Sequence, residues 1–191
     1  MKQNRKVFTM SLSALLIAVG ILVPMVSPIK IMVGPMSFTL ASHVAIMVAI
    51  FISPSVVVAV SLGTALGFLL AGQFPIVVVL RALSHVVWAF LGATYLKKHP
   101  DTLTSLFKTT MFILIIGLIH AIGEVLVVLP IYLGNSSVNE FIYMVFGLVG
   151  VGTLIHSSID LILSIAVWKV ICRSSSVASI ANVKKVSFAN I

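Results

Sequence analysis

The chain has 191 residues, of which 60% are hydrophobic and only 8% are charged. A soluble domain carries roughly a quarter charged residues, so this chain has too few charges to cover a water-facing surface. The net charge of +8 could indicate a nucleic-acid-binding protein, but the basic residues flank apolar runs, which is typical of membrane proteins. The composition therefore predicts a protein of the lipid bilayer with no nucleic-acid partner.

Six apolar runs follow one another along the chain, each bounded by proline, glycine or polar residues. Because a bilayer core of about 30 Å takes roughly 20 apolar residues per helix, these runs and their turns use the whole chain as one domain. They cover residues 7–26, 38–52, 56–71, 76–96, 106–131 and 141–171. We expect an all-α membrane protein with six transmembrane helices in a compact bundle. The last run exceeds one bilayer thickness, so a tilt or a break near residues 150–152 is expected.

The basic residues predict the orientation of the bundle. They lie before the first run, around the link after the fourth run, and at the end of the chain: Lys2, Arg5, Lys6, Lys97, Lys98, Lys108, Lys169, Arg173, Lys184 and Lys185. Only Lys30 would lie in an outer loop if the N-terminus is inside, which agrees with the positive-inside rule. We therefore expect both termini to be cytoplasmic, with residues 173–191 forming a polar cytoplasmic tail.

Small residues mark two helix surfaces that could pack closely against another helix. The third run has small residues at a spacing of four: Ala59, Gly63, Gly67 and Ala71. This pattern favours a packing seam inside the bundle, because small residues let helix backbones approach closely in lipid. The first run has Ala14 and Ala18 one turn apart, which fits either internal packing or docking onto another membrane subunit.

Seven ionisable residues fall within the apolar runs: His43, Arg81, His85, His120, Glu124, His156 and Asp160. Each is costly in hydrocarbon, so each should face the bundle interior or water and have a partner. Six of them form pairs at a spacing of four, which places both members of a pair on one helix face. A shared polar interior is therefore expected.

The positions of these residues along straight helices predict their depths. His43, Arg81 and Glu124 would lie near the outer surface, whereas Asp160 would lie in the inner half. The remaining three histidines would lie near mid-membrane, so an outer pocket would be lined by the first three residues and by His85. The guanidinium of Arg81 stays charged and matches a carboxylate as a bidentate fork. It could hold an anionic ligand, or it could pair with Glu124 in a purely structural network.

The buried polar residues suggest two other uses. Histidines with glutamate and aspartate could ligate a transition metal, but the expected depths differ and there is no H-E-x-x-H motif, so no metal or cofactor is predicted. A proton relay could run through His120, Glu124, His156 and Asp160. The sequence has no phosphate-binding loop and no G-x-S-x-G motif, so we expect a protein that is not an enzyme.

A six-span chain of this length with a basic N-terminus and Ala14-x-x-x-Ala18 resembles the substrate-binding S components of energy-coupling factor vitamin transporters. The stretches from Ser37 to Val44 and from Leu80 to Val86 are similar to the niacin branch of that family. The resemblance implies a protein of the bacterial cytoplasmic membrane. It also implies that the alanine motif docks onto a transmembrane T subunit, which two ABC ATPases drive.

The resemblance also implies roles for residues at the extracellular side. An acidic vitamin such as nicotinate or pantothenate would suit Arg81, with Glu124 beside it and His43 and His85 bonding the ring or its substituents. Stacking on the ligand and ordinary packing are both open for two aromatic residues, Phe38 and Trp88. The first outer loop, residues 27–37, would be a gate that uses Lys30, Gly34 and Pro35.

These expectations lead to one main hypothesis and two alternatives. The main hypothesis is a membrane receptor that binds niacin and delivers it to an ATP-driven module by toppling in the membrane, as the family does. The first alternative is a self-sufficient proton-coupled secondary transporter that uses the histidine and carboxylate chain. The second is a structural or assembly protein in which Arg81 and Glu124 only pair with each other.

Overall fold

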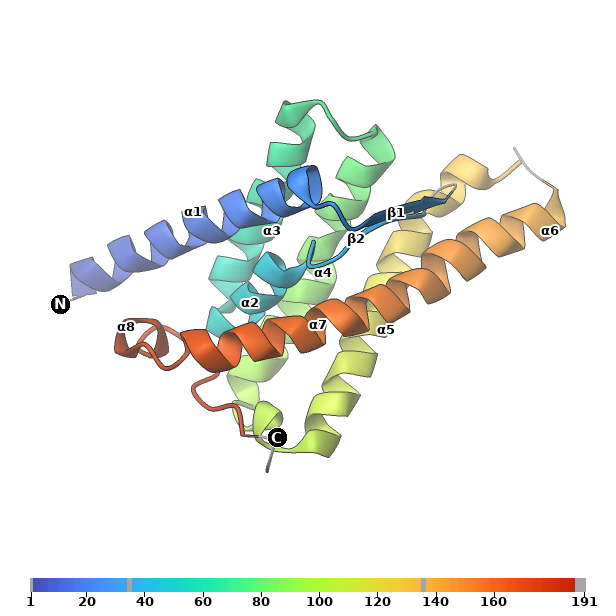
Figure 1. The fold of residues 1–191 in the computed structure, drawn as a ribbon. Coiled ribbons are helices and arrows are strands. Elements are labelled where there is room, and N and C mark those ends of the chain that lie inside the picture. Colours follow the sequence, from blue (N-terminus) through green and yellow to red (C-terminus); the bar gives the residue numbers. More distant parts are fainter. Residues whose placement is uncertain (1, 34–35, 135–136, 188–191) are drawn as a thin grey trace.

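The computed structural model describes residues 2–33, 36–134 and 137–187. The chain is mostly helical, with one small antiparallel hairpin near its N-terminal end (Figure 1). In order, the elements are α1 (Lys2–Val26), β1 (Lys30–Val33), β2 (Met36–Thr39), α2 (Val44–Ile52), α3 (Pro54–Ala71), α4 (Ile76–Lys98), η1 (Thr102–Thr104), α5 (Leu106–Tyr132), α6 (Val138–Phe141), η2 (Ile142–Val151), α7 (Gly152–Ile171) and α8 (Ser175–Ala178).

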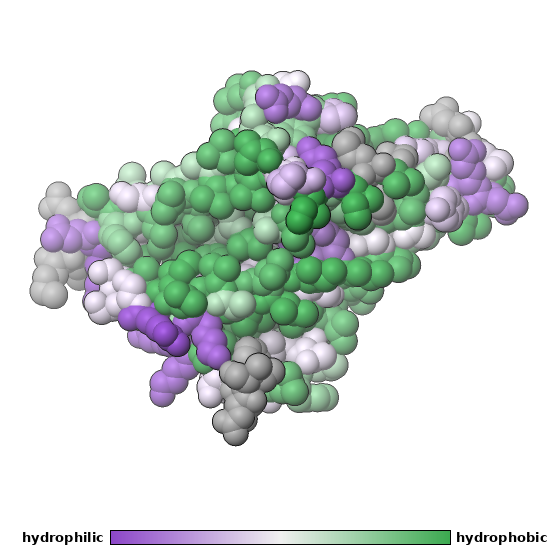
Figure 2. Space-filling model, in the orientation of Figure 1, coloured by the Kyte–Doolittle hydropathy of each residue, from purple (hydrophilic) through white to green (hydrophobic). Residues whose placement is uncertain are grey.

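Five helical segments of the described chain are long and apolar enough to cross a membrane. They are Asn4–Val26, Pro54–Ala71, Ile76–Lys98, Leu106–Tyr132 and Val138–Ile171. The face seen in Figure 2 is largely hydrophobic, and hydrophilic residues gather toward the ends of the molecule. A surface of this kind needs hydrocarbon around it, so the chain is a multi-pass membrane protein.

The second predicted span differs from the expected helix. Residues 38–52 contain the end of β2, a turn, and then the nine-residue helix α2, of which all but Val44 are buried. At about 1.5 Å per residue, α2 reaches roughly 14 Å, about half of a bilayer core. It packs against α1, α3, α4 and α7 and lies inside the bundle. Its hydrophobicity therefore reflects burial among helices, which composition alone cannot distinguish from contact with lipid.

The last predicted span remains helical through the expected break. The residues from Ile142 to Val151 form a π-helical stretch, and α7 continues from Gly152 without interruption (Figure 1). A π-helical stretch accommodates extra residues within a continuous helix and often marks a functional region. At the expected break the helix therefore changes its type and does not end.

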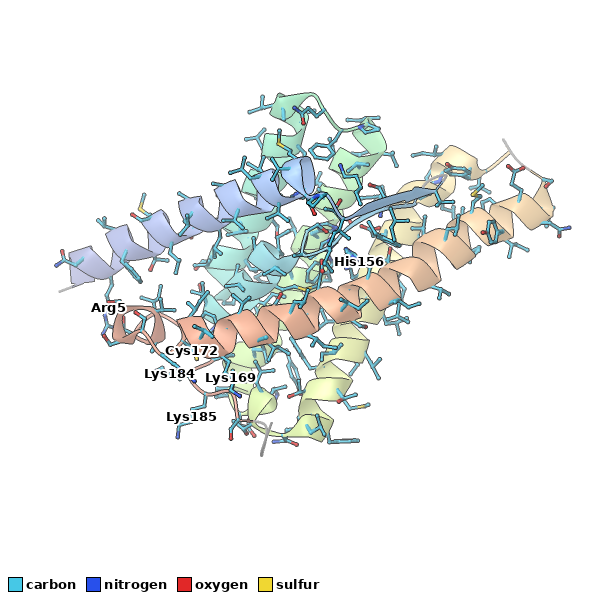
Figure 3. The ribbon with its side chains drawn as sticks, viewed as in Figure 1. Arg5, His156, Lys169, Cys172, Lys184 and Lys185 are labelled. Carbon is cyan, nitrogen blue, oxygen red and sulfur yellow. The ribbon has the colours of Figure 1, made fainter. Side chains whose placement is uncertain are left out.

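The C-terminal tail folds back onto the bundle. Val183 is fully buried, its carbonyl accepts a hydrogen bond from Trp168 Nε1 at 3.2 Å, and its N–H donates to the carbonyl of Phe51 at 3.1 Å. The tail is therefore more than a polar extension, because part of it completes the core beneath α2. Figure 3 labels four basic residues toward one end of the molecule: Arg5, Lys169, Lys184 and Lys185.

Two glycines of α3 form the seam with α1. A Cβ atom at Gly63 would meet three atoms of Ile17, the nearest at 2.6 Å, and a Cβ atom at Gly67 would clash with Ile21. The predicted internal seam is confirmed at these two positions. Ala59 and Ala71, at the two ends of the predicted stripe, are exposed instead.

We predict that Gly63→Leu lowers the thermal stability of the purified protein, because the added side chain occupies the space of Ile17. Overpacking of this kind costs about 1–3 kcal/mol. The measurement is thermal unfolding in detergent, followed by tryptophan fluorescence. Ala71→Leu, on the exposed part of the same helix, is the matched control and should leave the melting temperature unchanged. Equal melting temperatures for the two variants would contradict the seam.

Candidate functional site

A buried ion pair between α4 and α5 forms the centre of the polar interior. Arg81 is 5% exposed and Glu124 is 2% exposed. Arg81 Nε donates to Glu124 Oε2 at 2.7 Å, and Nη2 lies 2.5 Å from the same oxygen. Thr153 of α7 also donates to that oxygen, at 3.1 Å. Three helices thus meet at the carboxylate of Glu124. These contacts stabilise it, since a buried charge must be paired and hydrogen-bonded.

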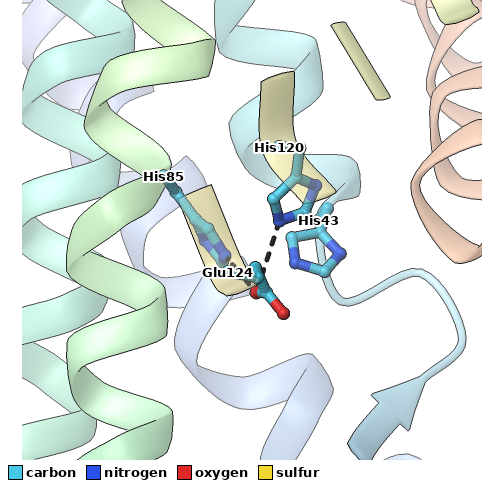
Figure 4. Close-up of side chains that lie close together, drawn as sticks. All are labelled: His43, His85, His120 and Glu124. Atoms are coloured by element: carbon cyan, nitrogen blue, oxygen red, sulfur yellow. Dashed lines mark hydrogen bonds and ion pairs between the residues drawn. The ribbon is translucent and has the colours of Figure 1, made fainter. Parts of the chain in front are cut away.

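The other oxygen of Glu124 faces two histidines. His85 Nε2 lies 3.2 Å and His120 Nε2 lies 3.4 Å from Glu124 Oε1. His43 completes this group, and the three imidazole rings lie 4.8 Å apart, centroid to centroid, in edge-on arrangements. Figure 4 shows His43, His85 and His120 gathered around Glu124.

Asp160 of α7 anchors the turn that leads into α2. Its carboxylate accepts hydrogen bonds from the backbone N–H groups of Ala41 at 2.9 Å and His43 at 3.0 Å. The same carboxylate lies 3.1 Å from His43 Nδ1 and 3.3 Å from His156 Nε2. Ala41 has a φ of 65°, a conformation that costs an alanine energy, so the bonds to Asp160 offset local strain. This anchoring positions the imidazole of His43.

The structure brings together residues that the straight-helix argument assigned to different depths. His43 is in contact with Asp160 and His156. The sequence argument had placed His43 near the outer surface and the other two residues deeper in the membrane. The reason is that residues 38–43 form a strand and a turn that enter the bundle. Irregular backbone is tolerated at membrane depth only where protein surrounds it. The depth argument against a metal site therefore does not hold.

A cavity of about 50 Å³ lies beside the ion pair. A water molecule needs about 10–15 Å³ of cavity volume, so the cavity has room for a few waters. Four of the predicted site residues line it: Arg81, His43, His85 and Glu124. The other lining residues are Pro24, Ser37, Thr39, Ser42, Ile46, Thr64, Phe68, Phe74, Val78 and Ala82.

Sequence reasoning missed the hydroxyl and phenyl groups of this cavity. Thr64 was hidden among the small residues of α3, and Phe68 and Phe74 carry no polar signal. The helical period offered a partial clue, because Phe68 lies one turn after Thr64 on the same face of α3. Thr153 was missed as well, since a lone threonine in an apolar run does not indicate a carboxylate partner.

The two predicted aromatic site residues pack on histidines. Phe38 stacks on His156 with ring centroids 4.7 Å apart, and Trp88 stacks on His120 at 4.6 Å. Within the described part of the chain, neither ring lines the cavity beside Arg81. Their arrangement fits the ordinary-packing alternative, in which they support the histidine rings from outside the cavity.

The predicted gate residue Lys30 lies on the hairpin, and the predicted docking residues lie on α1. Lys30, at the start of β1, has its Nζ 5.8 Å from the ring centroid of Phe74, which lines the cavity. The other two gate residues, Gly34 and Pro35, lie outside the described residues. Ala14 and Ala18 are exposed on α1. The gating and docking roles stay predictions.

We predict that Asp160→Ala loosens the turn before α2, since it removes the acceptor of two backbone N–H groups and a partner of His43. Removing one member of a buried polar network costs about 3–5 kcal/mol. Hydrogen exchange should become faster at Ala41 and His43, and the melting temperature should fall. Asp101→Ala is the control, because the pair that Asp101 forms with Lys108 is exposed. Unchanged exchange in Asp160→Ala would contradict the anchoring role.

Comparison with known proteins places the chain in a family. No family model and no solved structure matches it. The chain is 39% identical over 174 residues to the niacin transporter NiaX of Lactococcus lactis subsp. cremoris (strain MG1363). The aligned residues cover 90% of this chain and 78% of that protein. With its five membrane-length helices, this chain is a multi-pass protein of the bacterial cell membrane. It belongs to the family of the niacin transporter NiaX, which confirms the resemblance to niacin-type S components.

Proposed function

We propose that the chain is the membrane-embedded substrate-binding subunit of an importer for niacin, and that Arg81 binds the carboxylate of the vitamin. The observation that carries this proposal is a buried guanidinium at the wall of a cavity, with its charge compensated by Glu124. The name of the related transporter supports niacin as the substrate. Pantothenate, another acidic vitamin, is the second candidate ligand.

A nicotinate molecule would find complementary groups around this cavity. Its carboxylate would meet the guanidinium of Arg81 and the imidazole of His85, both of which can donate N–H groups. Charge-assisted bonds of this type are stronger than neutral ones. The pyridine ring would lie against Phe68 and Phe74, whose rings are 4.3 Å apart. Hydroxyl groups of Ser42 and Thr64 are within the same lining and could bond the ring nitrogen.

Binding would require the cavity to open. Its volume of about 50 Å³ suits a few waters and is too small for an aromatic ring with a carboxylate. Phe74 lines the cavity, and Lys30 of the hairpin lies over its ring, so a movement of the hairpin would remove this contact from the phenyl group. This contact supports the proposal that residues 27–37 form the gate.

An energy source outside this chain is part of the proposal. The sequence has no nucleotide-binding motif, so a transmembrane T subunit with two ABC ATPases would supply the energy. The exposed alanines of α1 would dock onto that subunit, since small residues permit close helix contact in lipid. The basic end of the bundle would face the cytoplasm, in agreement with the positive-inside rule.

A proton-coupled secondary transporter is the second candidate function. It is favoured by two hydrogen bonds, one between His85 and Glu124 and one between His43 and Asp160, and the two imidazole rings lie edge-on with centroids 4.8 Å apart. The two functions differ in what the purified chain does alone. Uptake of labelled nicotinate into liposomes that contain only this chain, driven by a pH gradient, would support the secondary transporter.

We predict that nicotinate binds at least tenfold more tightly than nicotinamide in calorimetric titrations of the wild-type protein. Nicotinamide lacks the charge that would pair with Arg81, and a hydrogen bond to a charged group is worth about 1.5–3 kcal/mol. Arg81→Ala should remove this preference, and Arg81→Lys should restore part of the affinity for nicotinate. Equal affinities of the wild type for nicotinate and nicotinamide would show that Arg81 does not recognise the carboxylate.

We predict that Ala14→Leu weakens co-purification with the T subunit and leaves nicotinate binding intact. The leucine would hold α1 apart from the helix of the T subunit that docks onto it. Ala14 lies far along α1 from the lining of the cavity, so nicotinate binding should not change. Ala71→Leu, at an exposed alanine of α3, is the matched control for added bulk on the lipid-facing surface. Normal recovery of the complex with Ala14→Leu would count against this docking face.

A further inference from the structure

We propose that His43, His85, His120 and Glu124 form a binding site for a divalent transition-metal ion such as Zn²⁺ or Ni²⁺. This inference goes beyond the proposed niacin function and does not depend on the identity of the vitamin. One ligand atom from each of the four residues lies within 4.8 Å of all the others. Imidazole nitrogen with one carboxylate oxygen is a ligand set that suits Zn²⁺, Ni²⁺ and Cu²⁺.

The two shortest separations match the edge of a metal coordination shell. His85 Nε2 and His120 Nε2 lie 3.2 and 3.4 Å from Glu124 Oε1. Bonds of about 2.0–2.1 Å to a tetrahedral Zn²⁺ place neighbouring ligand atoms about 3.3–3.4 Å apart. Direct N–H···O bonds to a carboxylate are shorter, about 2.7–2.9 Å. The two observed distances therefore match the edges of such a shell and are longer than a charge-assisted hydrogen bond.

The rings converge from three helical elements. His43 precedes α2, His85 lies on α4, and His120 lies on α5 next to Glu124. Their planes meet at 66°, 73° and 87°, so the rings are edge-on to one another and do not stack (Figure 4). An arrangement of this kind can direct one nitrogen from each ring toward a common point.

Outer partners hold two of these rings through the nitrogen opposite to the metal. His43 Nδ1 lies 3.1 Å from Asp160 Oδ2, and His120 Nδ1 lies 3.1 Å from Ser157 Oγ. Metal-binding histidines usually have such a partner, often a carboxylate, which fixes the tautomer and the ring orientation. Asp160 and Ser157 would thereby leave Nε2 of each ring to the ion.

Two carboxylates lie beside the site, Glu124 and Asp160, and Arg81 compensates the charge of the first. Glu124 bonds Arg81 and Thr153 through Oε2, so Oε1 is the oxygen that faces the histidines. A second group of potential ligands, His43, His156 and Asp160, is also close. The first group is favoured because Asp160 already binds two backbone N–H groups. His43, His85 and Glu124 also line the cavity, so an ion would have a coordination position that faces it.

The test uses the full-length protein in lipid nanodiscs, purified without a polyhistidine tag and treated with EDTA. No vitamin is added, so the result is independent of niacin binding. Zn²⁺ is titrated by calorimetry, and Co²⁺ binding is followed by its visible absorption. We expect one high-affinity ion per chain and the intense Co²⁺ bands of four-coordinate geometry. Absence of ion binding, or only the weak bands of a six-coordinate surface ion, would overturn the proposal.

Matched variants assign the site to its ligands. His120 lies outside the described lining of the cavity, so His120→Asn should lower Zn²⁺ affinity at least a hundredfold without removing nicotinate binding. Ser157→Ala keeps all four ligands and should lower the affinity about tenfold, which is the range for an outer partner. His99→Asn is the control, because His99 is exposed at the end of α4 and should have no effect. Equal affinities for His120→Asn and His99→Asn would overturn the proposal.

Discussion

The ion pair between Arg81 and Glu124 determines much of the organisation of this bundle. A permanent cation inside an apolar helix bundle needs a partner, and the partner needs hydrogen bonds to its remaining lone pairs. Glu124 satisfies both needs, because one of its oxygens binds Arg81 and Thr153 and the other faces two histidines. The contacts join α4, α5 and α7, so the polar centre also fixes the arrangement of these helices.

The short helix α2 depends on a second polar anchor. The turn that leads into it would leave backbone N–H groups unsatisfied in the bundle, and Asp160 accepts two of them. That contact brings His43 beside His85 and His120, and so joins the two halves of the polar interior. The hairpin β1–β2 then lies directly before the turn, where Lys30 contacts Phe74. Ligand capture and movement of the hairpin would be coupled through this phenyl ring.

The sequence predicted the membrane class, the polar interior and the ionisable part of the cavity wall, because these follow from hydropathy and from the cost of charges in lipid. Arg81, Glu124, His43 and His85 indeed line one cavity. The conformation of residues 38–43 could not be predicted, since the run from Phe38 to Ile52 has the composition of a helix. Its turn is stabilised by Asp160, which is more than a hundred residues away along the chain. Contacts of that separation leave no local pattern, so the meeting of four histidines was not foreseen.

The most direct measurement is an experimental structure of the full-length protein with nicotinate bound. The account predicts that the carboxylate of nicotinate lies within hydrogen-bonding distance of the Arg81 guanidinium, in an enlarged cavity with Phe74 displaced. A structure in which nicotinate binds elsewhere, with the pair between Arg81 and Glu124 unchanged and the cavity empty, would contradict it.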